Sequence, residues 1–459
     1  MKIPANQGNR AGNSRREVLL KLGAASTGSA AVASGAQQAP SPRRTIQTDV
    51  LVIGGGTAGT IAAIQAGRVG AKTVLVEAGS QLGGTMTTAG VDFPGLFHAW
   101  GKQIIAGIGW ELVTAAVNLN GDRLPDFSIP YGTSHPKHQV RLNGALYAAL
   151  AEEACVKAGV ELRYYETPVS IEKAENGWRV QLIGKGTQID VVARQLIDCT
   201  GNAAAIALMG LPREREAANQ PGSLIYRLGG YDLAQADLDD MTEKAAEAVR
   251  AGRLQSTDLR HNLRGFLRNG GENATHILGA DSSTSELHTR TNIHGRQSLL
   301  RMMRFLKPFR GFEGMKLERL QPEAGVRETY RIVGETKVTV GDYTSGRKFA
   351  DAVSYSFYPI DLHDERGIQP RPLKQGVVAT VPLGALIPKS ADHVMVAGRC
   401  VSSDRLANSA LRVQASCMGM GQAAGAAAAL AARLGLTPGK VPLSNVLKTL
   451  GEHGAITPA

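Results

Sequence analysis

Cysteine is scarce in this chain, and its scarcity excludes a disulfide framework. Four cysteines in 459 residues are too few to hold together a fold of this length. They show neither a CxxC pair nor the spacing of metal ligands, no CxxCH motif for haem attachment occurs, and the histidines form no metal-binding cluster. We therefore expect no metal site and interpret the cysteines as packed side chains, with a redox pair of Cys400 and Cys417 as the alternative.

Aromatic residues are also few, at 5%, whereas glycine is abundant, with 54 residues. An apolar fraction of 43% and a charged fraction of 20% are typical of a globular chain and exclude a disordered one. A length of 459 residues allows two connected domains with a large buried core. The composition therefore favours a globular fold with many tight turns.

Residues 1–36 have the pattern of an export signal. Residues 14–21, SRREVLLK, resemble the twin-arginine signal S-R-R-x-F-L-K, with Val18 in place of the usual Phe. A weakly apolar stretch, Leu19–Ala33, follows and ends at a small-residue cleavage site, with Ser34-Gly35-Ala36 as a second option. Lys21 and many small residues interrupt this stretch, so we expect no stable membrane span.

This signal implies the twin-arginine export machinery as a partner. We expect a periplasmic or exported protein that is soluble after cleavage. A disordered basic tail is the alternative interpretation of residues 1–36.

Basic residues outnumber acidic ones, and the net charge is +11. Residues 1–36 hold five basic residues against Glu17, so +4 of this charge belongs to the leader and +7 to the rest of the chain. A basic stretch between Arg290 and Arg310 raises the hypothesis of nucleic-acid binding. No nucleic-acid module surrounds it, and its loosely helical spacing favours a solvated helix face or a face near an anionic substrate. We therefore expect no nucleic-acid partner.

The strongest motif lies in residues 48–77. An apolar run is followed by Gly54-x-Gly56-x-x-Gly59, a small-residue helical stretch and a second apolar run that ends on Glu77. In a dinucleotide site the first glycine permits a tight turn, the second lets the backbone approach a pyrophosphate, and the third lets the helix pack on the strand. The helix start offers N–H groups and a positive dipole end to phosphates, and the acid accepts hydrogen bonds from a ribose.

A glycine-rich turn without a ligand is the alternative, but the complete strand–turn–helix–strand–acid pattern favours a dinucleotide site. The residues expected to bind the cofactor here are Gly54, Gly56, Thr57, Ala58, Gly59 and Glu77.

The glycine pattern alone does not separate NAD from FAD, and two further signals favour FAD. The loop Ala78–Thr85 resembles the Gly-Gly-Thr loop of FAD enzymes of the glutathione-reductase type, which runs beside the flavin half. After an expected helix at 141–159 and a β-meander between 160 and 193, the segment Gln195–Asn202 resembles the second FAD signature, an apolar strand and a Thr-Gly turn. The expected binding residues here are Ala78, Gly83, Gly84, Thr85, Val169, Thr200 and Gly201.

A third segment with features of a cofactor-binding sequence lies near the end of the chain. Val394–Arg399 reads as a strand that runs into a glycine turn, and a helix is expected to begin near Gly419 and to continue to Leu434. Such a helix start can direct its dipole at the flavin N1–C2=O edge, although an Ala/Gly-rich packing helix is the alternative. No NAD site is expected there, because the required strand is missing. The predicted binding residues are Gly398, Arg399, Gly421, Gln422 and Ala424.

Together these segments resemble the bacterial FAD-dependent oxidoreductase family related to the succinate dehydrogenase and fumarate reductase flavoproteins. The resemblance rests on residues 49–88, 195–202, 327–335, 358–363 and 397–425. It implies a two-domain fold with FAD at the interface. Relatives with covalent FAD carry a His after the Gly-Gly loop, where this chain has Thr85-Met86-Thr87-Thr88, so the FAD is expected to be non-covalent.

The resemblance sets the expected fold class as α/β. It comprises a Rossmann-type FAD-binding domain, with a parallel sheet plus a β-meander, and an inserted α+β substrate domain. We assign residues 46–205 and 375–435 to the discontinuous FAD-binding domain, residues 206–374 to the inserted domain and residues 436–459 to a C-terminal tail.

The chemistry expected from such a cofactor is hydride transfer to flavin N5, with a base that takes a proton and a cation that holds the substrate. The candidate base is His363, oriented by Asp361, and Arg331 is the candidate for polarising the substrate. His98 is a candidate proton shuttle. The alternatives are structural: residues 359–363 anchor a strand, Arg331 pairs with Glu328 or Glu335, and His98 is only a polar group near a cofactor loop.

Three functions remain open. The first is a dehydrogenase that oxidises a small alcohol, sugar or similar substrate and passes electrons to a non-nicotinamide acceptor such as a quinone or cytochrome. The second is a fumarate-reductase-like enzyme that reduces an unsaturated acid. The third is a flavin-bearing binding protein without turnover. The absence of a haem-attachment motif favours oxidation over reduction.

Overall fold

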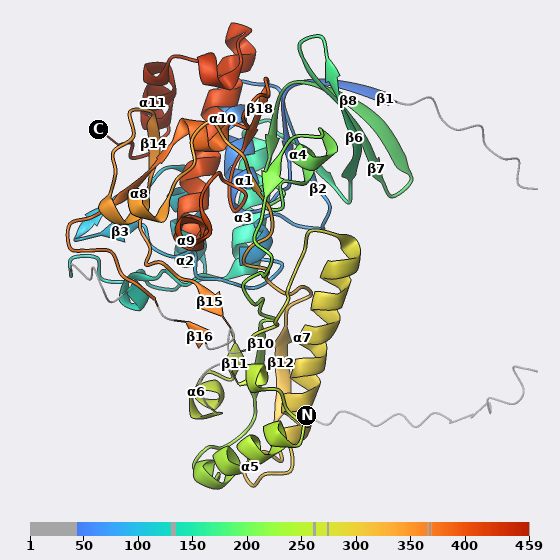
Figure 1. The fold of residues 1–459 in the computed structure, drawn as a ribbon, viewed down its shortest axis with the longest axis vertical. Coiled ribbons are helices and arrows are strands. Elements are labelled where there is room, and N and C mark those ends of the chain that lie inside the picture. Colours follow the sequence, from blue (N-terminus) through green and yellow to red (C-terminus); the bar gives the residue numbers. More distant parts are fainter. Residues whose placement is uncertain are drawn as a thin grey trace, which may run out of the picture. The chain divides into compact units, whose positions relative to one another are not determined.

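The computed structural model describes residues 44–129, 135–259, 263–272, 275–364, 367–368 and 370–458. Residues 1–36, for which the sequence predicts an export signal, lie outside the described residues. Within residues 44–458 the elements follow one another as drawn in Figure 1.

The main sheet has seven strands in the order β5-β2-β1-β8-β7-β6, with β18 paired to β8. β5, β2, β1, β8 and β18 are parallel, whereas β6, β7 and β8 form an antiparallel meander. This arrangement confirms the predicted α/β class with a parallel sheet and a β-meander. The strands are β1 (Arg44–Ile53), β2 (Thr73–Glu77), β5 (Glu161–Tyr164), β6 (Thr167–Ala174), β7 (Gly177–Gly184), β8 (Thr187–Asp198) and β18 (Val394–Val396).

Strand β8 belongs to both parts of this sheet. Its residues Thr187–Ala193 pair with β7, and its residues Leu196–Asp198 pair with β18. On its other side β8 pairs with β1 along almost the whole length of β1. A strand from late in the chain is thus added to a sheet that the first part of the chain begins.

Successive side chains of a strand point to opposite faces of the sheet. The side chains of β1 therefore belong to two different cores, one on each face. Val50 and Val52 of β1 belong to a core that includes side chains of α1, α2, α3 and α10, whereas Leu51 and Ile53 belong to a core with the meander and α4 (Ala204–Leu208). The bounds of the first four helices are α1 (Thr57–Arg68), α2 (Ile108–Leu119), α3 (Gly144–Lys157) and α10 (Gln414–Leu434).

Helix α10 packs closely on α1. A Cβ at Gly421 would collide with the Ala58 carbonyl oxygen, and one at Gly425 would collide with that of Ala62, so glycine is required at both positions. Helix α11 (Leu443–Glu452), in the segment expected to be a tail, packs on α10 and buries Val446.

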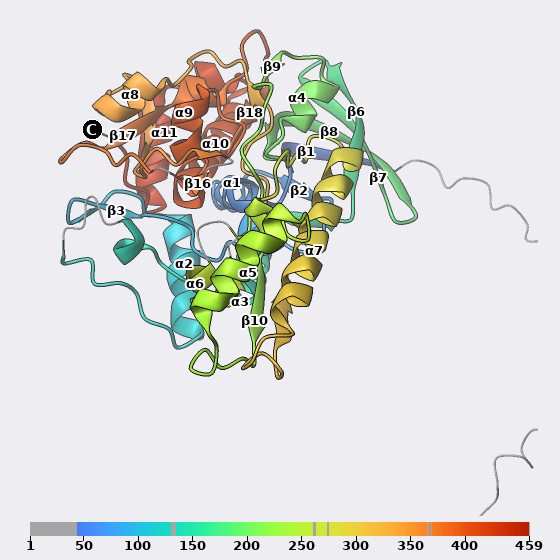
Figure 2. The ribbon, with the colours of Figure 1, turned by 60° about the horizontal axis from the view of Figure 1, so that its bottom comes forward.

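A second region has its own sheet and its own core. β10 (Tyr226–Gly229) lies between β11 (Gly271–Glu272) and β12 (Lys316–Leu320). Side chains of this sheet pack with α5 (Leu238–Arg250), α6 (Leu263–Arg268) and α7 (Ser285–Leu306), which gather around it in Figure 2. Asp237 caps α5 and Thr284 caps α7, each by accepting a backbone N–H hydrogen bond.

Short paired strands complete the structure. β3 pairs with β4, β9 with β13, β14 with β17 and β15 with β16. Two further helices, α8 and α9, lie before and after the β14–β17 pair in the chain. The bounds are β3 (His98–Ala99), β4 (Lys102–Gln103), β9 (Arg213–Glu214), β13 (Arg331–Ile332), α8 (Val340–Ser345), β14 (Ala352–Ser356), β15 (His363–Asp364), β16 (Gly367–Ile368), β17 (Ala379–Pro382) and α9 (Arg405–Leu411).

Part of the segment expected to be an inserted domain packs with the main sheet. Tyr343, Val353 and Phe357 belong to the same core as α1 and α10. The boundary at residue 374 stays a prediction of domain organisation. In the described part of the chain, no helix has the length and apolar character needed to cross a bilayer.

Candidate functional site

A large cavity of about 1450 Å³ runs along the carboxyl ends of the central parallel strands. Gly54 and Gly56 follow β1, Glu77 ends β2 and Thr200 follows β8, and all four line this cavity. Ligands of open α/β sheets bind at this edge, where the carboxyl ends of the strands leave a crevice. From here the cavity extends to loops of the second region and to residues 358–363; we call it the main cavity.

The three glycines of the first motif have three separate roles. Gly54 has a φ of +99°, which favours glycine, and a Cβ there would lie 2.6 Å from the Cys199 carbonyl oxygen. A Cβ at Gly59 would collide with the Gly54 carbonyl oxygen, because α1 lies against the turn. A Cβ at Gly56 would meet no atom within 4 Å. The space beside Gly56 is therefore free for a ligand.

The Glu77 carboxylate joins two loops of this wall. It accepts hydrogen bonds from Gly55 N at 2.7 Å and from Gly79 N at 2.6 Å. Burial raises the pKa of Glu77, and these backbone hydrogen bonds oppose the rise. A carboxylate has about four lone-pair sites, so acceptor capacity remains for ribose hydroxyls.

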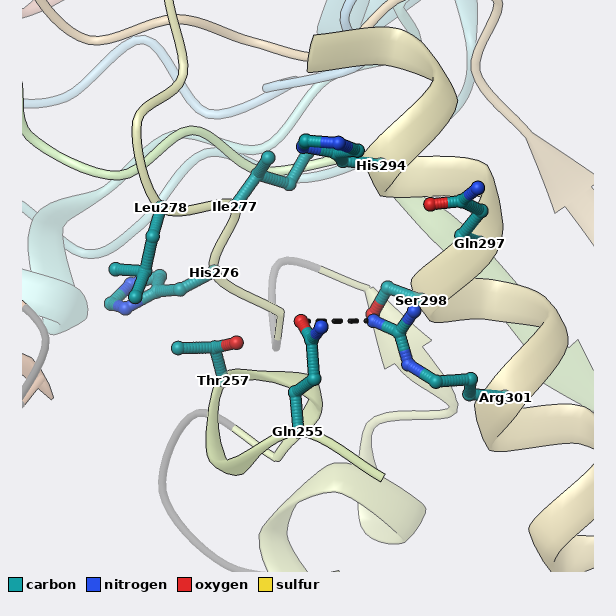
Figure 3. A pocket seen from close by; sticks show the side chains of 9 residues that line it. All are labelled: Gln255, Thr257, His276, Ile277, Leu278, His294, Gln297, Ser298 and Arg301. Atoms are coloured by element: carbon teal, nitrogen blue, oxygen red, sulfur yellow. Dashed lines mark hydrogen bonds between the residues drawn. The ribbon is translucent and has the colours of Figure 1, made fainter. Parts of the chain in front are cut away.

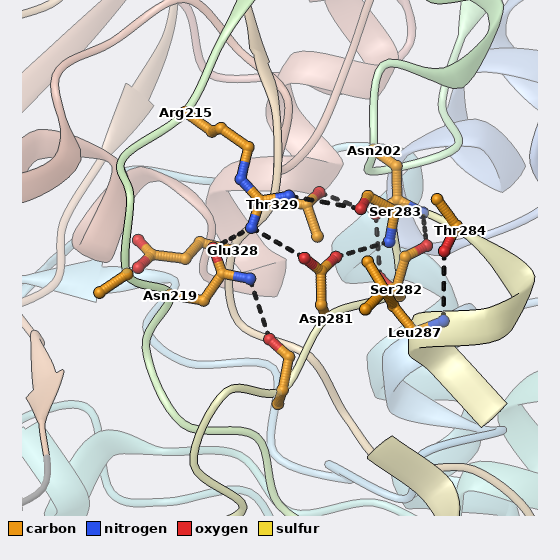
Figure 4. A network of polar contacts seen from close by, with 12 residues as sticks. Asn202, Arg215, Asn219, Asp281, Ser282, Ser283, Thr284, Leu287, Glu328 and Thr329 are labelled. Carbon is orange, nitrogen blue, oxygen red and sulfur yellow. Dashed lines mark hydrogen bonds and ion pairs between the residues drawn. The ribbon is translucent and has the colours of Figure 1, made fainter. Parts of the chain in front are cut away.

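The second motif is tied to the loop before α7. The Asn202 side chain donates to the Ser282 carbonyl oxygen at 2.7 Å, and its Oδ1 accepts from Ser282 Oγ at 3.0 Å and from Thr329 Oγ1 at 2.8 Å (Figure 4). Arg215 holds the same loop through an ion pair of 2.8 Å with Asp281. This network makes residues 282–285 part of the wall of the main cavity.

Arg399 fixes the junction between these loops. Its guanidinium donates to the Gly201 carbonyl oxygen and to Asn202 Oδ1, each at 2.9 Å, and to the Val326 carbonyl oxygen. Burial lowers the pKa of Arg399. Three segments that are distant in sequence meet at this one side chain, which also lines the main cavity.

The other end of the main cavity holds a cluster of imidazole and charged side chains. The His363 ring lies between two partners: Nε2 is 3.1 Å from Asp361 Oδ2, and Nδ1 is 3.2 Å from His276 Nε2. The Arg412 guanidinium donates to the Asp361 carbonyl oxygen at 3.1 Å and lies 3.5 Å from its carboxylate. Arg327 lines the cavity together with Asp361, His363 and Arg412.

The charges of this cluster follow from its surroundings. Burial lowers the pKa of His363 to about 2, and the charge of Arg327 acts in the same direction. Burial alone would raise the pKa of Asp361, but the hydrogen bond with His363 and the charge of Arg412 lower it to about 2. Near neutral pH the pair is an ionised carboxylate and a neutral imidazole. Since a carboxylate only accepts, Nε2 carries the ring hydrogen and Nδ1 accepts from His276.

Two buried polar atoms beside this cluster lack a hydrogen-bond partner among the described residues. They are Nε of Arg412 and Oε1 of Gln414, and both residues line the main cavity. An unpaired buried donor or acceptor costs roughly 1–3 kcal/mol. A polar ligand that reaches these two atoms would recover that free energy.

Many residues that the sequence predicts for the site line the main cavity. They are Gly54, Gly56, Thr57, Ala58, Glu77, Ala78, Gly84, Thr85, Thr200, Gly201, Gly398, Arg399 and His363. Gly59 and Gly83 are outside the lining but shape it, since Gly83 N donates to the Gly55 carbonyl oxygen at 2.9 Å. Val169 is also outside the lining, although its neighbours Thr167 and Pro168 are part of it.

The last helix differs from the sequence-based expectation. α10 begins at Gln414, and not near Gly419, so the residues that reach the main cavity are Arg412, Val413, Gln414 and Cys417. The glycine-rich part of the sequence lies further along α10, where small residues serve packing.

Gly421, Gln422 and Ala424 accordingly lie outside the lining of the main cavity. Gly421 makes room for α1. Gln422 Nε2 donates to Gln65 Oε1 and to the His453 carbonyl oxygen, each at 3.1 Å. The structure thus favours the alternative interpretation of this segment, an Ala/Gly-rich packing helix.

Replacing Gly421 with Ala tests this interpretation. We expect the free energy of unfolding of the flavin-free protein to fall by about 1–3 kcal/mol, because the added methyl group forces α10 away from α1. Urea unfolding of the flavin-free protein measures the change. Gly451→Ala is the control, because a Cβ at Gly451 on α11 meets no atom within 4 Å. Unchanged stability of Gly421→Ala would contradict the packing role.

His98 and Arg331 also lie outside the lining of the main cavity. The His98 ring stacks on Phe127 with 3.8 Å between centroids, and burial lowers its pKa to about 4. The Arg331 guanidinium is held by both carboxylate oxygens of Glu216 at 2.8 Å and by the Ser403 carbonyl oxygen at 2.9 Å. Its partner is therefore neither Glu328 nor Glu335.

Several parts of the wall of the main cavity could not be predicted from the sequence. No motif marks the loop at 282–285, the loop at 322–326, or Gln139 and Arg141, yet all line the main cavity. His276, which contacts His363, also carried no signal. Within the described residues, no group of three or more His, Cys, Asp or Glu side chains is arranged to hold a metal ion.

The chain belongs to the family of FAD dependent oxidoreductases, which matches residues 49–450. Among solved structures it is similar to a geranylgeranyl bacteriochlorophyll reductase-like protein from Thermoplasma acidophilum, with 14% identity, 89% of this chain and 82% of that chain covered, and a TM-score of 0.38. It is also similar to the p-nitrophenol 4-monooxygenase PnpA from Pseudomonas putida DLL-E4, with 13% identity, coverage of 89% and 84%, and a TM-score of 0.36.

A third similar structure is the anhydrotetracycline hydroxylase OxyS from Streptomyces rimosus, with 15% identity, coverage of 89% and 66%, and a TM-score of 0.41. These likenesses are too distant to indicate a substrate. Family membership makes this protein an FAD-dependent oxidoreductase.

The residues of the main cavity fit FAD. The space beside Gly56 suits a pyrophosphate, and the Glu77 carboxylate lies at the end of the neighbouring strand, where a ribose would reach it. At the far end, Arg412 Nε offers a donor and Gln414 Oε1 an acceptor without present partners. A long cofactor with polar groups at both ends would satisfy all of these groups.

Proposed function

We propose that this protein oxidises a small organic substrate, such as an alcohol or a sugar, by hydride transfer to the flavin N5 of FAD. The electrons then pass to a non-nicotinamide acceptor such as a quinone or cytochrome. One observation carries the proposal: the dinucleotide turn at Gly54–Gly59 and the Asp361–His363 pair open into the same cavity. When bound, FAD supplies the hydride acceptor.

The FAD is proposed to be non-covalent and to be held by three parts of the chain. The first is the turn and loop of residues 54–59 and 77–85. The second is Thr200 and Gly201. The third is the start of α10, whose positive dipole end suits a group that gains negative charge on reduction. No His stands at Thr85–Thr88, after the Gly-Gly loop, to form a covalent bond.

The Asp361–His363 pair is proposed to take up the substrate proton. The carboxylate is ionised and aligned by two partners, His363 Nε2 and Arg412, and a neutral imidazole stands behind it to share the proton. Arg327 and Arg412 give this end of the cavity positive charge, which holds a substrate oxygen that becomes negative.

The same two guanidinium groups favour one alternative. Two arginines near each other can bind the carboxylates of an unsaturated acid, which a fumarate-reductase-like enzyme reduces. The pair Asp361–His363 would then deliver a proton and not accept one. Export through the twin-arginine machinery, signalled by residues 1–36, is a separate proposal that concerns residues outside the described part of the chain.

Anaerobic titration of the flavin absorbance tests the proposed function. The purified protein is mixed with sugars, alcohols, hydroxy acids and amines, and dithionite gives the full bleaching signal. Reduction by one class supports oxidation and identifies that class. If none reduces the flavin, but an unsaturated acid reoxidises the dithionite-reduced protein, the reductase alternative holds. A flavin that neither group of compounds affects indicates a binding protein.

The pH dependence of kcat/KM is expected to lack a step near the usual pKa of histidine, about 6.5. Because burial lowers the pKa of His363 to about 2, the imidazole stays neutral as the pH falls through that range. Asp361, also with a pKa of about 2, stays ionised. The profile should therefore be flat between about pH 5 and pH 8. A loss of activity near pH 6.5 that disappears in His363→Gln would contradict this expectation.

A further inference from the structure

A buried carboxylate is connected to the Asp361–His363 pair through one glutamine. Glu328 is 2% exposed and lies outside the lining of the main cavity. Its Oε1 accepts hydrogen bonds from Nε and Nη2 of Arg405 at 3.0 and 2.7 Å. Burial alone would raise the pKa of Glu328, but its hydrogen bonds with Arg405 and Gln220 lower it overall. Glu328 is therefore ionised near neutral pH, and its oxygens only accept.

Gln220 makes this connection, and its side chain is completely buried. Its Nε2 donates to Glu328 Oε2 at 2.9 Å, and its backbone N donates to Glu328 Oε1 at 2.6 Å. Its Oε1 accepts from the His363 backbone N at 3.0 Å and from Arg412 Nη2 at 3.4 Å. One amide oxygen thus contacts both His363 and the guanidinium that pairs with Asp361.

The charge of Glu328 decides which way the Gln220 amide faces. Because a carboxylate accepts hydrogen bonds and cannot donate one, the NH₂ group of Gln220 faces Glu328. The amide oxygen then faces two donors, the His363 N–H and the Arg412 guanidinium. In the reversed orientation, oxygen would face oxygen at Glu328, and NH₂ would face both donors. Only one of the two orientations matches every donor with an acceptor.

Helix α9 adds two further contacts to the backbone of residues 361–363. Asp361 N donates to Ser409 Oγ at 3.1 Å, and Arg412, which follows the last residue of α9, donates to the Asp361 carbonyl oxygen at 3.1 Å. Together with the His363 N–H bond to Gln220, these contacts hold the backbone of the segment at three points.

The His363 ring has contacts of its own, which are separate from this backbone support. Nε2 is 3.1 Å from Asp361 Oδ2, and Nδ1 is 3.2 Å from His276 Nε2. His276 lies beside a small cavity of about 150 Å³ at α7, and in Figure 3 its side chain points away from His294 and Arg301 of that helix. Side chains thus contact the ring of His363, whereas the Gln220 amide contacts its backbone.

We propose that Glu328 and Gln220 are positioning residues, which align His363 and Arg412 for proton transfer at Asp361. This inference rests on the proposed function. Neither residue lines the main cavity, so both act through the groups that Gln220 Oε1 holds. A misplacement of about 1 Å in reacting groups can lower a rate by about 100-fold. The effect on kcat should therefore follow the orientation of the Gln220 amide.

Glu328→Gln tests the proposal because it reverses this orientation. The new side-chain oxygen can still accept from Arg405 and from the Gln220 backbone N, and the new NH₂ group then faces the Gln220 amide. That amide must turn its oxygen toward the new group and its own NH₂ toward His363 and Arg412. We expect kcat to fall by about 10- to 100-fold, with unchanged affinity for FAD. Single-turnover flavin reduction and flavin titration measure the two quantities.

The double variant Gln220→Glu/Glu328→Gln exchanges the two side chains and restores the pattern of donors and acceptors. The NH₂ group at position 328 then donates to a carboxylate at position 220, whose other oxygen accepts from His363 N and Arg412. We expect most of the lost kcat to return. Arg405 regains no carboxylate, so any stability lost in Glu328→Gln, measured by urea unfolding of the flavin-free protein, stays lost. A role of Glu328 in the ion pair alone predicts no recovery of kcat.

Nitrogen NMR of the flavin-free protein, labelled at histidine, gives a readout without turnover. The backbone amide signal of His363 is identified by its absence in His363→Gln. We expect Glu328→Gln to move the amide proton to a lower chemical shift, since this N–H loses its acceptor, and the double variant to return it. Asp342→Asn is the matched control, because Asp342 also pairs with an arginine, Arg347, and lies outside the lining of the main cavity.

The outcomes separate the positioning role from the proposed function. An unchanged kcat in Glu328→Gln, or a double variant as slow as Glu328→Gln, overturns the positioning role while substrate oxidation stands. If no substrate reduces the flavin, the proposed function fails, and the NMR signal alone decides whether Glu328 controls the contact of Gln220 with His363. A His363 amide signal that responds equally to Glu328→Gln and Asp342→Asn, or to neither, overturns the inference in either case.

Discussion

Replacing Asp361 with Asn is expected to lower kcat by about 10²- to 10⁴-fold, the usual contribution of a general acid or base. Asn has the same shape and keeps a hydrogen bond to His363, but it cannot take up a proton at neutral pH. FAD is expected to stay bound, because the dinucleotide turn lies at the other end of the main cavity. Single-turnover flavin reduction under anaerobic conditions measures the loss directly.

His363→Gln is expected to give a loss of similar size, and the double variant little more than either single one. Residues that act as a unit show such non-additive losses. Asp342→Asn, the variant of a paired carboxylate outside the main cavity, is expected to keep its rate. Additive losses, or a slow Asp342→Asn variant, would contradict the assignment of proton transfer to the Asp361–His363 pair.

His98→Gln examines the other histidine that the sequence suggested. Since His98 stacks on Phe127 outside the cavity lining, we expect kcat to remain near that of the unmodified protein. A loss of kcat as large as that of His363→Gln would show that His98 takes part in the reaction.

Gly56→Ala is expected to weaken FAD binding by about 10- to 100-fold, because overpacking of a close contact costs about 1–3 kcal/mol. The stability of the flavin-free protein should not fall, since the new Cβ meets no atom within 4 Å. The two effects are separated by flavin titration followed by fluorescence and by urea unfolding of the flavin-free form.

Gly59→Ala gives the opposite result in the same experiment. Its Cβ would collide with the Gly54 carbonyl oxygen, so we expect the flavin-free protein itself to lose stability. Gly451→Ala, which also meets no atom within 4 Å but lies on α11, should change neither quantity downward. If Gly56→Ala kept full affinity for FAD, the pyrophosphate would not lie against this turn.

The first motif could be predicted from the sequence because its parts are adjacent in the chain. A strand, a tight turn, a helix and a second strand are local structures. Gly59 meets the Gly54 carbonyl oxygen, and Glu77 accepts from Gly55 N and Gly79 N, so both residues have partners within thirty residues. The meander and its connection to Thr200 were predictable for the same reason. The alternation of apolar residues and the turn glycines between β6 and β8 predict these strands directly.

The far end of the site could not be predicted because its partners are distant in sequence. Arg412, which donates to the Asp361 carbonyl oxygen, follows it by 51 positions, and no local pattern reports such a pair. His276 and His363 meet across 87 positions from two different regions. The role of the α10 glycines is hard to predict for another reason: a glycine that admits a helix backbone and one that admits a phosphate look alike in sequence.

The use of β8 by both early and late strands has a consequence for the newly made chain. A nascent protein that has left the ribosome up to residue 390 has the turn at Gly54–Gly59 but lacks β18, Arg412 and the helix that backs α1. Its cavity would be open along one side, with the small residues of α1 exposed to water. On the proposed mode of binding, FAD is therefore acquired only after synthesis of α10 is complete. A chain truncated before this helix would lack the cofactor and would keep apolar surface exposed. Chaperones and proteases would act on such a chain.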